Sequence, residues 1–300
     1  MAEGRVPIKR AVLFVNLHKE NSALIVEEIR RDLEDRGIAV TVFPFEGKPG
    51  RSPEGEWDIA FSLGGDGTVL YTARSLADTG TPILPVNLGT LGFIAGVRYS
   101  EWPAVFEQWL RGTACLSRRC MLELSVKRRG DTVVRNIFLN DAVISASGIA
   151  KLIKLDVHSE IVPGEYTELG FYRSDGLIIA TATGSTAYSM AAGGPILDPE
   201  MEALIICPIC PFTLSNRSLV LPARPALIIT VAQEQRSGVL LTVDGQDIFD
   251  LEPEDRIIVQ QASRQALLIS ADRRSYYSAL RTKLAWSGSG LGNDDGGGNA

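Results

Sequence analysis

The segment Gly64-Gly65-Asp66-Gly67-Thr68 carries the residue types that a phosphate-handling site needs. It follows an apolar run typical of a strand and precedes a segment with helical spacing. Backbone N–H groups and a helix N-terminus can therefore face phosphate oxygens. The glycines Gly64, Gly65 and Gly67 allow close approach of the backbone, and Thr68 adds a hydroxyl. No Gly-Lys-Ser/Thr follows, so this is not a Walker loop.

Asp66 is the most informative residue of this loop. A carboxylate among phosphate-binding amides is electrostatically unfavourable unless it binds Mg²⁺ or a hydroxyl. A kinase needs such a group to orient and deprotonate the attacking hydroxyl, and general-base assistance is worth about 10²–10⁴ in rate. The loop thus predicts phosphoryl transfer from a nucleotide to a sugar hydroxyl, with Asp66 as the base. The alternative is a glycine-rich turn in which Asp66 only accepts local backbone hydrogen bonds.

Two further groups of polar residues could contact a nucleotide. Asn140-Asp141 stands between strand-type apolar residues and suits ribose hydroxyls or an adenine edge, although a turn-forming pair is the simpler explanation. Asp175 can accept a hydrogen bond from a carboxamide or hydroxyl, and Tyr188 can stack and donate. The small residues of Thr183–Thr186 would let the backbone approach a flat ligand, or would serve tight packing of a helix on a sheet.

The elements that must position these residues fall into two kinds. Strands are expected at residues 11–15, 38–43, 58–63 and 82–86, with helices at 22–37, 69–77 and 100–111 between them. This alternation predicts an open parallel α/β sheet domain over residues 1–114. Short β-type runs then predict an all-β, β-sandwich-like domain over residues 115–271. A helix within residues 272–286 should pack back on the first domain, and the tail, residues 287–300, should be disordered.

Composition limits the classes of function. Thirty basic and 36 acidic residues give a formal net charge of −6, which offers no support for nucleic-acid binding. No apolar run approaches the roughly 20 residues of a membrane helix, so we expect no membrane contact and a cytoplasmic protein. The spacing of Cys207 and Cys210 could suit zinc, but the chain has only two histidines, His18 and His158, and neither lies near. We expect free thiols and no metal-ligating residues.

Taken together, these motifs resemble the NAD kinase family. The resemblance is carried by Gly64–Thr68, Asn87–Phe93, Asn140-Asp141, Asp175–Leu177, Thr183–Ser189, Thr213–Arg217, Val243–Gln246 and Leu280–Leu284. It extends over residues 10–286. The first motif is shared with lipid kinases and phosphofructokinases, whereas the later motifs are much more specific to NAD kinases.

The resemblance implies ATP-dependent phosphorylation of the adenosine 2′-hydroxyl of NAD, giving NADP, with Mg²⁺ or another divalent cation assisting. NAD would bind between the two domains, often across a subunit contact, in a homodimer or homotetramer. Asp66 would be the base. The implied NAD contacts are Asp66, Gly67, Phe93, Asn140, Asp141, Lys151, Arg173, Asp175, Thr186, Ala187, Tyr188, Ala191 and Gln246. The ATP phosphates would lie against Gly64, Gly65, Gly67 and Thr68.

Two departures from the family pattern matter. Asp141 stands where the family has glutamate, and because its side chain is shorter by one methylene, its hydroxyl contact would be lost or bridged by water. Phe212 stands where members often have histidine. Two other functions share parts of the pattern, a lipid kinase with the same glycine–aspartate loop and a non-catalytic dinucleotide sensor. The first predicts an amphipathic membrane-facing helix, which the sequence does not show, and loss of Asp66 would be the sequence sign of the second.

Overall fold

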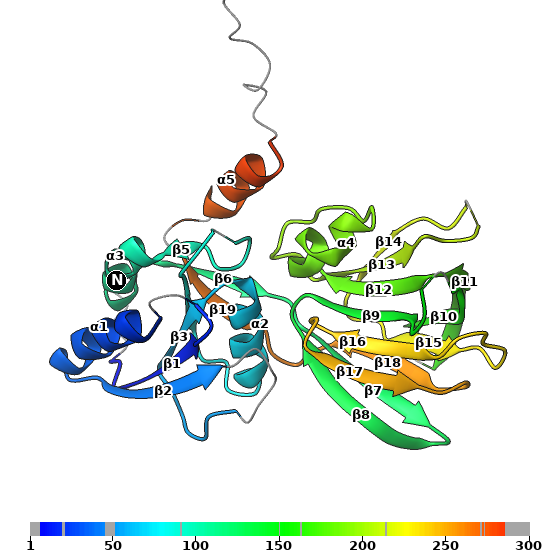
Figure 1. Ribbon diagram of the computed structural model, residues 1–300, viewed down its shortest axis with the longest axis horizontal. Coiled ribbons are helices and arrows are strands. Elements are labelled where there is room, and N and C mark those ends of the chain that lie inside the picture. The colour runs from blue at the N-terminus through cyan, green and yellow to red at the C-terminus, as the bar shows by residue number, and fades with distance from the viewer. Residues whose placement is uncertain are drawn as a thin grey trace, which may run out of the picture.

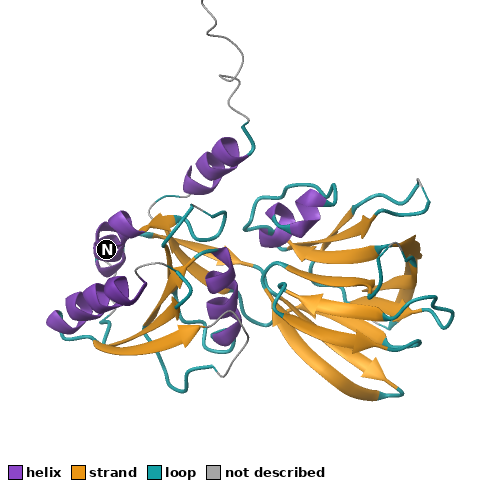
Figure 2. Cartoon of the chain, in the orientation of Figure 1, coloured by secondary structure: helices purple, strands orange, loops and turns teal. Residues whose placement is uncertain are grey.

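The computed structural model divides into an α/β domain and a domain built almost entirely of strands (Figures 1 and 2). The structure describes residues 7–19, 22–45, 52–90, 92–149, 151–162, 164–213, 215–270, 272 and 274–285. The predicted disordered tail lies outside these residues. The fold class predicted from the sequence, α/β plus all-β, is confirmed. Within the described chain, no helix combines the length and apolar character needed to cross a bilayer.

The α/β domain is organised around one sheet of order β2-β1-β3-β4-β19-β6, with β5 paired to β4. Its strands are β1 Arg10–Asn16, β2 Ala39–Phe45, β3 Ile59–Gly64, β4 Ile83–Asn87, β5 Val97–Arg98, β6 Cys115–Arg119 and β19 Ala266–Ser270. Val12 and Phe14 of β1 enter one apolar core, and Leu13 and Val15 enter another on the opposite face. Because both faces of this parallel strand are buried, it is apolar from Ala11 to Val15.

Helices cover both faces of the sheet. α1 (Ser22–Asp35) and α3 (Trp102–Leu110), which follows a 3-10 turn at Tyr99–Glu101, pack on one face. α2 (Asp66–Ser75) packs on the other. α2 begins three residues before the predicted helix at 69, because Gly65 has extended dihedral angles and serves as its N-cap. Asp66 is therefore the first residue of a helix rather than the middle of a loop.

The first sheet includes strands from either side of the β-domain sequence. β6 and β19 are paired antiparallel, and β19 is parallel to β4. Both strands lie on the β-domain side of the predicted boundaries at 115 and 271. Their sequences gave little indication of this, because β6 has mixed burial along its length, while β19 is short and follows directly after the β-domain strands.

The β domain consists of two six-stranded antiparallel sheets, of orders β11-β10-β15-β18-β7-β8 and β14-β13-β12-β9-β16-β17. The strands of the first are β7 Leu122–Arg128, β8 Asp131–Phe138, β10 Ile153–Val162, β11 Glu165–Ser174, β15 Leu227–Val231 and β18 Arg256–Gln261. Those of the second are β9 Asp141–Ala146, β12 Gly176–Thr181, β13 Ala203–Ile209, β14 Leu219–Pro222, β16 Val239–Val243 and β17 Asp247–Leu251. One core takes side chains from both sheets, for example Leu124 of β7 and Leu177 of β12. The sheets therefore form a sandwich.

Short helical segments complete the chain. A 3-10 turn at Thr183–Thr186 and α4 (Tyr188–Ala191) follow β12 at the end of the β domain that faces the α/β domain (Figure 1). α5 (Arg274–Lys283) follows β19 and contacts both domains. The Lys283 ammonium lies 4.7 Å from the centroid of the Phe93 ring, while the Tyr276 hydroxyl donates to the Leu197 carbonyl at 3.1 Å.

Candidate active site

The glycine-rich loop lies at the carboxyl end of β3, where open α/β sheets bind ligands. A Cβ atom at Gly64 would lie 2.1 Å from Oγ1 of Thr68, so no larger residue fits there without a shift. Gly65 and Gly67 have open space at the corresponding positions. The backbone is thus most accessible to a phosphate at Gly65 and Gly67.

Thr68 is placed differently from the expectation that its hydroxyl binds phosphate. Its side chain is buried against Gly64, with 1% of the residue exposed. The buried Oγ1 makes no hydrogen bond to any residue that the structure describes. A phosphate contact by this hydroxyl would require the loop to move.

Asp66 is bound by the segment that follows β4. Its Oδ2 accepts a hydrogen bond from Phe93 N at 2.9 Å, and its Oδ1 accepts from Ile94 N at 3.2 Å and Ala95 N at 2.8 Å. A Cβ atom at Gly92 would lie 1.8 Å from Oδ1, so this arrangement requires glycine at position 92. An ionised carboxylate has about four acceptor positions, which leaves roughly one, on Oδ2, for a ligand.

Asp244 shapes the loop that carries Asn140 and Asp141. Its buried carboxylate accepts backbone hydrogen bonds from Leu139 at 3.0 Å, Asn140 at 2.8 Å and Asp141 at 3.1 Å. Asp244 itself has a φ of 49°, which aspartate tolerates in a tight turn before Gly245. The Asn140 Oδ1 is buried and has no hydrogen-bond donor among the described residues. Such an unpaired amide oxygen is a place where a ligand donor can bind.

Asp141 and Asp244 form a pair of buried carboxylates. Burial, followed by the nearby charge of Asp244, raises the pKa of Asp141 to about 7, although a backbone hydrogen bond from Tyr188 opposes the shift. Burial also raises the pKa of Asp244, against the backbone hydrogen bonds and the charge of Arg74. Asp141 is therefore a carboxyl group that can donate as well as accept a hydrogen bond near neutral pH.

The segment after β12 packs against this loop. A Cβ atom at Gly184 would lie 2.1 Å from the Asn140 carbonyl oxygen, so glycine permits the close approach of the two backbones. Thr186 is buried, Ala187 is half-buried and the Tyr188 side chain is 48% exposed. Ala191 is also exposed. The predicted contacts Thr186, Ala187, Tyr188 and Ala191 thus lie beside Asn140 and Asp141.

Arg74 of α2 connects the two domains. Its guanidinium donates to Gln246 Oε1 at 3.0 Å, to Asn136 Oδ1 at 2.9 Å and to the Asp247 carboxylate, and its Nε lies 4.0 Å from Asp244 Oδ2. Gln246 Nε2 in turn donates to the Gly67 carbonyl at 3.0 Å. These contacts join the glycine loop to the loop of Asn140 and Asp141. Sequence reasoning missed Arg74, because nothing local distinguishes it from other helical arginines.

Lys151, Arg173 and Asp175 lie away from this cluster. β12 pairs with β9 so that Gly176 is opposite Ser145, whereas Ala180 is opposite Asp141. At about 3.4 Å per residue, Asp175 is therefore roughly 17 Å along the strand from the level of Asp141. Lys151 and Arg173 line a separate cavity of about 450 Å³. Within a single chain, the structure divides the predicted contacts into two groups.

Known proteins share this architecture. A model of the ATP-NAD kinase N-terminal domain matches residues 48–114, and a model of the ATP-NAD kinase C-terminal domain matches residues 139–271. An NAD kinase of Treponema denticola is 40% identical over 284 residues, covering 94% of this chain and 98% of the relative. An NAD kinase of Symbiobacterium thermophilum is 40% identical over 282 residues, covering 91% and 98%.

Solved structures agree with the sequence comparisons. Yeast NADH kinase complexed with NADH superposes with a TM-score of 0.83 at 25% identity, covering 94% of this chain and 89% of that one. An NAD kinase from Archaeoglobus fulgidus in complex with ATP has the same fold, with a TM-score of 0.71 at 22% identity and coverage of 90% and 97%. With both domains matched and relatives aligned along nearly their whole length, the chain belongs to the NAD kinase family.

Proposed function

We propose that this protein phosphorylates the 2′-hydroxyl of the adenosine ribose of NAD, using ATP as the donor and giving NADP. The observation that carries the proposal is the position of Asp66, in the first turn of α2 and next to Gly67, whose carbonyl accepts a hydrogen bond from Gln246 of the β domain. Membership of the NAD kinase family supports it. The lipid kinase and the non-catalytic sensor are not proposed, since the matches extend through the family-specific β domain.

In the proposed reaction, Asp66 orients the ribose hydroxyl and accepts its proton. The three N–H groups of the segment 93–95 fix the carboxylate, and the remaining acceptor position on Oδ2 would take the hydroxyl. As the hydroxyl oxygen bonds to the γ-phosphorus, the bond to the β,γ-bridging oxygen breaks and ADP leaves. Little covalent chemistry falls to the protein, so alignment of the hydroxyl is the main contribution of Asp66.

The ATP phosphates would lie on the open side of the glycine loop. Gly65 and Gly67 leave room for close approach, and the N-terminus of α2 contributes a favourable partial charge. Gly64 would not contact the phosphates itself; because it has no side chain, the Thr68 side chain can pack directly against it. Mg²⁺ would arrive with these phosphates, which with water supply most ligands of magnesium in such sites. Among the described residues no group of three or more His, Cys, Asp or Glu side chains could hold a metal ion, so we assign Mg²⁺ no protein cage.

The adenosine of NAD would bind where the two domains meet. The unpaired Asn140 Oδ1 and the Asp141 carboxyl group suit its polar groups, and Tyr188 offers an exposed ring. Phe93, half-buried beside the backbone that holds Asp66, would lie against the adenine. Thr186, Ala187, Ala191 and Gln246 would line the rest of the dinucleotide site.

Lys151, Arg173 and Asp175 would reach the site of a second copy in a homodimer or homotetramer. The cavity beside Lys151 and Arg173 is lined by four cations, including Lys154 and Arg236, against one carboxylate, that of Glu234, which suits an anionic pyrophosphate. The neighbouring β10–β11 hairpin exposes large apolar side chains, which suit a contact between copies. These are Ile161, Val162, Tyr166 and Phe171, each 44% exposed or more.

The thiols of the chain are unpaired, which supports a cytoplasmic location.

The test is incubation of the purified protein with ATP, Mg²⁺ and NAD, followed by detection of NADP with glucose-6-phosphate dehydrogenase. We expect NADP to accumulate in proportion to enzyme and to time. A reaction without ATP is the matched control. Binding of NAD without any NADP formed would contradict the proposed catalysis and would favour a sensor.

A further inference from the structure

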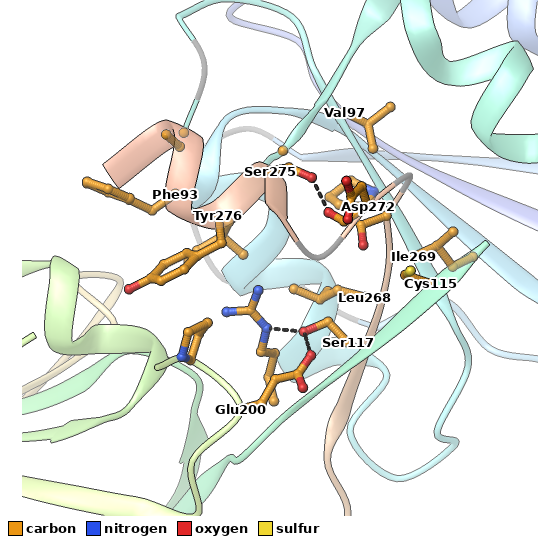
Figure 3. A pocket seen from close by; sticks show the side chains of 18 of the residues that line it. Phe93, Val97, Cys115, Ser117, Glu200, Leu268, Ile269, Asp272, Ser275 and Tyr276 are labelled. Carbon is orange, nitrogen blue, oxygen red and sulfur yellow. Dashed lines mark hydrogen bonds between the residues drawn. The ribbon is translucent and has the colours of Figure 1, made fainter. Parts of the chain in front are cut away.

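A cavity of about 250 Å³ borders the proposed dinucleotide site at Phe93 and lies between α5, β6, β19 and the segments 92–97 and 198–200 (Figure 3). We call it the α5 pocket. Of the residues assigned above to substrates, only Phe93 contributes to its lining. An apolar cavity of about 150 Å³ is enough to bind benzene, so the α5 pocket has room for one ring and a small polar group.

The pocket contains a buried guanidinium with most of its donors unused. Arg119 is 7% exposed and lines the pocket. Its Nε–H donates to Ser117 Oγ at 2.8 Å, but the four Nη–H donors make no hydrogen bond to any described residue, and no described carboxylate lies within ion-pair distance. The charges of Glu200 and Asp198 offset part of the cost of burying this guanidinium, and its Nη atoms, which are not fully buried, open onto the pocket.

The acidic neighbours do not supply the missing partner. Glu200 accepts a hydrogen bond from Ser117 Oγ at 2.7 Å, which Figure 3 shows, and Asp198 accepts from Glu200 N at 2.9 Å and from the Tyr277 hydroxyl. Burial lowers the pKa of Arg119, against the opposing effect of the charges of Glu200, Tyr276 and Asp198. The Ser117 hydroxyl, itself bound to Glu200, holds the Nε–H of Arg119, and the outer donors face the pocket.

The rest of the wall fits a flat apolar body. Phe93 and Tyr276 present aromatic rings, and Leu268 and Val97 present aliphatic side chains, as Figure 3 shows. Tyr276 is held by its hydroxyl at the Leu197 carbonyl, so its ring is fixed in the wall. Aromatic rings pack favourably with aromatic walls in offset or edge-to-face arrangements.

We propose that the α5 pocket binds a small aromatic monocarboxylate, with its carboxylate on the Nη donors of Arg119 and its ring between Phe93, Tyr276 and Leu268. A planar guanidinium matches a carboxylate with two parallel hydrogen bonds. Asp198, Glu200 and Asp272 also line the pocket and oppose any anion, a dianion more strongly than a monocarboxylate, so binding depends on the paired hydrogen bonds to Arg119. The site shares the segment 92–97 with Asp66 but does not use the acceptor position proposed for ribose.

The experiment uses benzoate as the probe and benzamide as its uncharged counterpart, with binding to the full chain measured by calorimetry. A second readout is the reaction of Cys115 with a thiol reagent, because Cys115 is exposed and lines the pocket. It is measured in a C210S background, since Cys210 is also exposed. We expect benzoate to bind and to slow modification of Cys115, and benzamide at the same concentration to do neither.

Two variants test the role of the guanidinium. R119K keeps the charge but loses the planar pair of donors, and should weaken benzoate binding at least about tenfold. R118K, at the exposed neighbouring arginine, is the matched control and should bind like the parent. If R119K does not fold, A279L on α5, which fills the pocket, replaces it. The proposal is overturned if the parent protein does not bind benzoate, if benzamide binds equally, or if folded R119K or A279L binds benzoate undiminished.

Discussion

The Oδ2 oxygen of Asp66 lies 2.9 Å from the backbone nitrogen of Phe93, 27 residues further along the chain. The adjacent N–H groups of Ile94 and Ala95 bind Oδ1, so one carboxylate both starts a helix and fixes the segment after β4. The same side chain is therefore a structural element and the proposed base. Changes to Asp66 and changes to its partners should separate these two roles.

D66N should lower kcat by about 10²–10⁴ while NAD still binds, because the amide cannot accept the hydroxyl proton. The amide NH₂ would also face backbone donors, so we expect a loss of about 1–3 kcal/mol in unfolding free energy. Steady-state kinetics, NAD titration and urea unfolding check these outcomes. An unchanged kcat would refute the assignment of Asp66 as the base.

G92A tests whether the position of the Asp66 carboxylate matters, while Asp66 itself is left unchanged. The added methyl group would fall 1.8 Å from Asp66 Oδ1, so the carboxylate or the segment 92–95 must shift. We expect kcat to fall at least about tenfold, since small misplacements at a reacting centre are costly. G89A is the matched control, because a Cβ atom there meets nothing closer than 3.7 Å. Equal kinetics for the two variants would argue against this positioning.

The sequence sufficed for those parts of the fold and site that depend on neighbouring residues. The unbroken apolar run of β1 followed from burial on both faces, and the strand–loop–helix around Asp66 is a local pattern. Distant contacts were not predictable in this way. The hydrogen bond between Arg74 and Gln246 joins residues 172 positions apart, and the pairing of β6 with β19 joins the two ends of the β-domain sequence.

Proximity in sequence was also a poor guide to proximity in the site. Asp175 precedes Thr186 by only eleven positions, yet the two residues lie at opposite ends of β12, Asp175 just before the strand and Thr186 just after it. The extended strand therefore separates residues that a helix of that length would have kept closer. The pairing of β12 with β9 shows which end of β12 lies next to Asp141: Ala180, near Thr186, is opposite Asp141, whereas Gly176, next to Asp175, is opposite Ser145.

Stability should depend on pH through Asp141. Its folded pKa of about 7 lies above the unfolded value near 3.8, so the unfolded state releases the proton first as pH rises. The stabilising contribution of the protonated form is full below about pH 4 and is lost as pH rises toward 7. D141N should therefore gain on the order of 1–3 kcal/mol over the parent at pH 8 and little at pH 4. Urea unfolding of D141N and the parent at pH 4 and pH 8 measures this gain. An equal stability difference between the two proteins at both pH values would contradict the raised pKa of Asp141.

Arg74 should stabilise the junction of the domains. R74A leaves the carboxylates of Asp244 and Asp247 without their cation, which should cost about 3–5 kcal/mol and lower kcat through the lost support of Gln246 and Gly67. R30A, on the solvent-exposed face of α1, is the matched control and should leave the free energy of unfolding almost unchanged. Urea unfolding of both variants decides, and similar losses would show that the junction does not depend on Arg74.

The division of the predicted contacts into two groups leads to a test with mixed subunits. Asp66 lies at the junction of the domains, whereas Arg173 lies at the far end of the β domain, beside exposed apolar residues of β11. If a second copy supplies Arg173, D66N and R173A each disable every site in their own assemblies. A mixed dimer, however, contains one site with an intact Asp66 from one chain and an intact Arg173 from the other.

Refolding the two inactive variants together should therefore restore about a quarter of the parental sites, because half of randomly formed dimers are mixed and each has one intact site. Mixing each variant with itself is the control. If both residues act within one chain, every site in the mixture retains a defect, and activity stays at the level of the single variants.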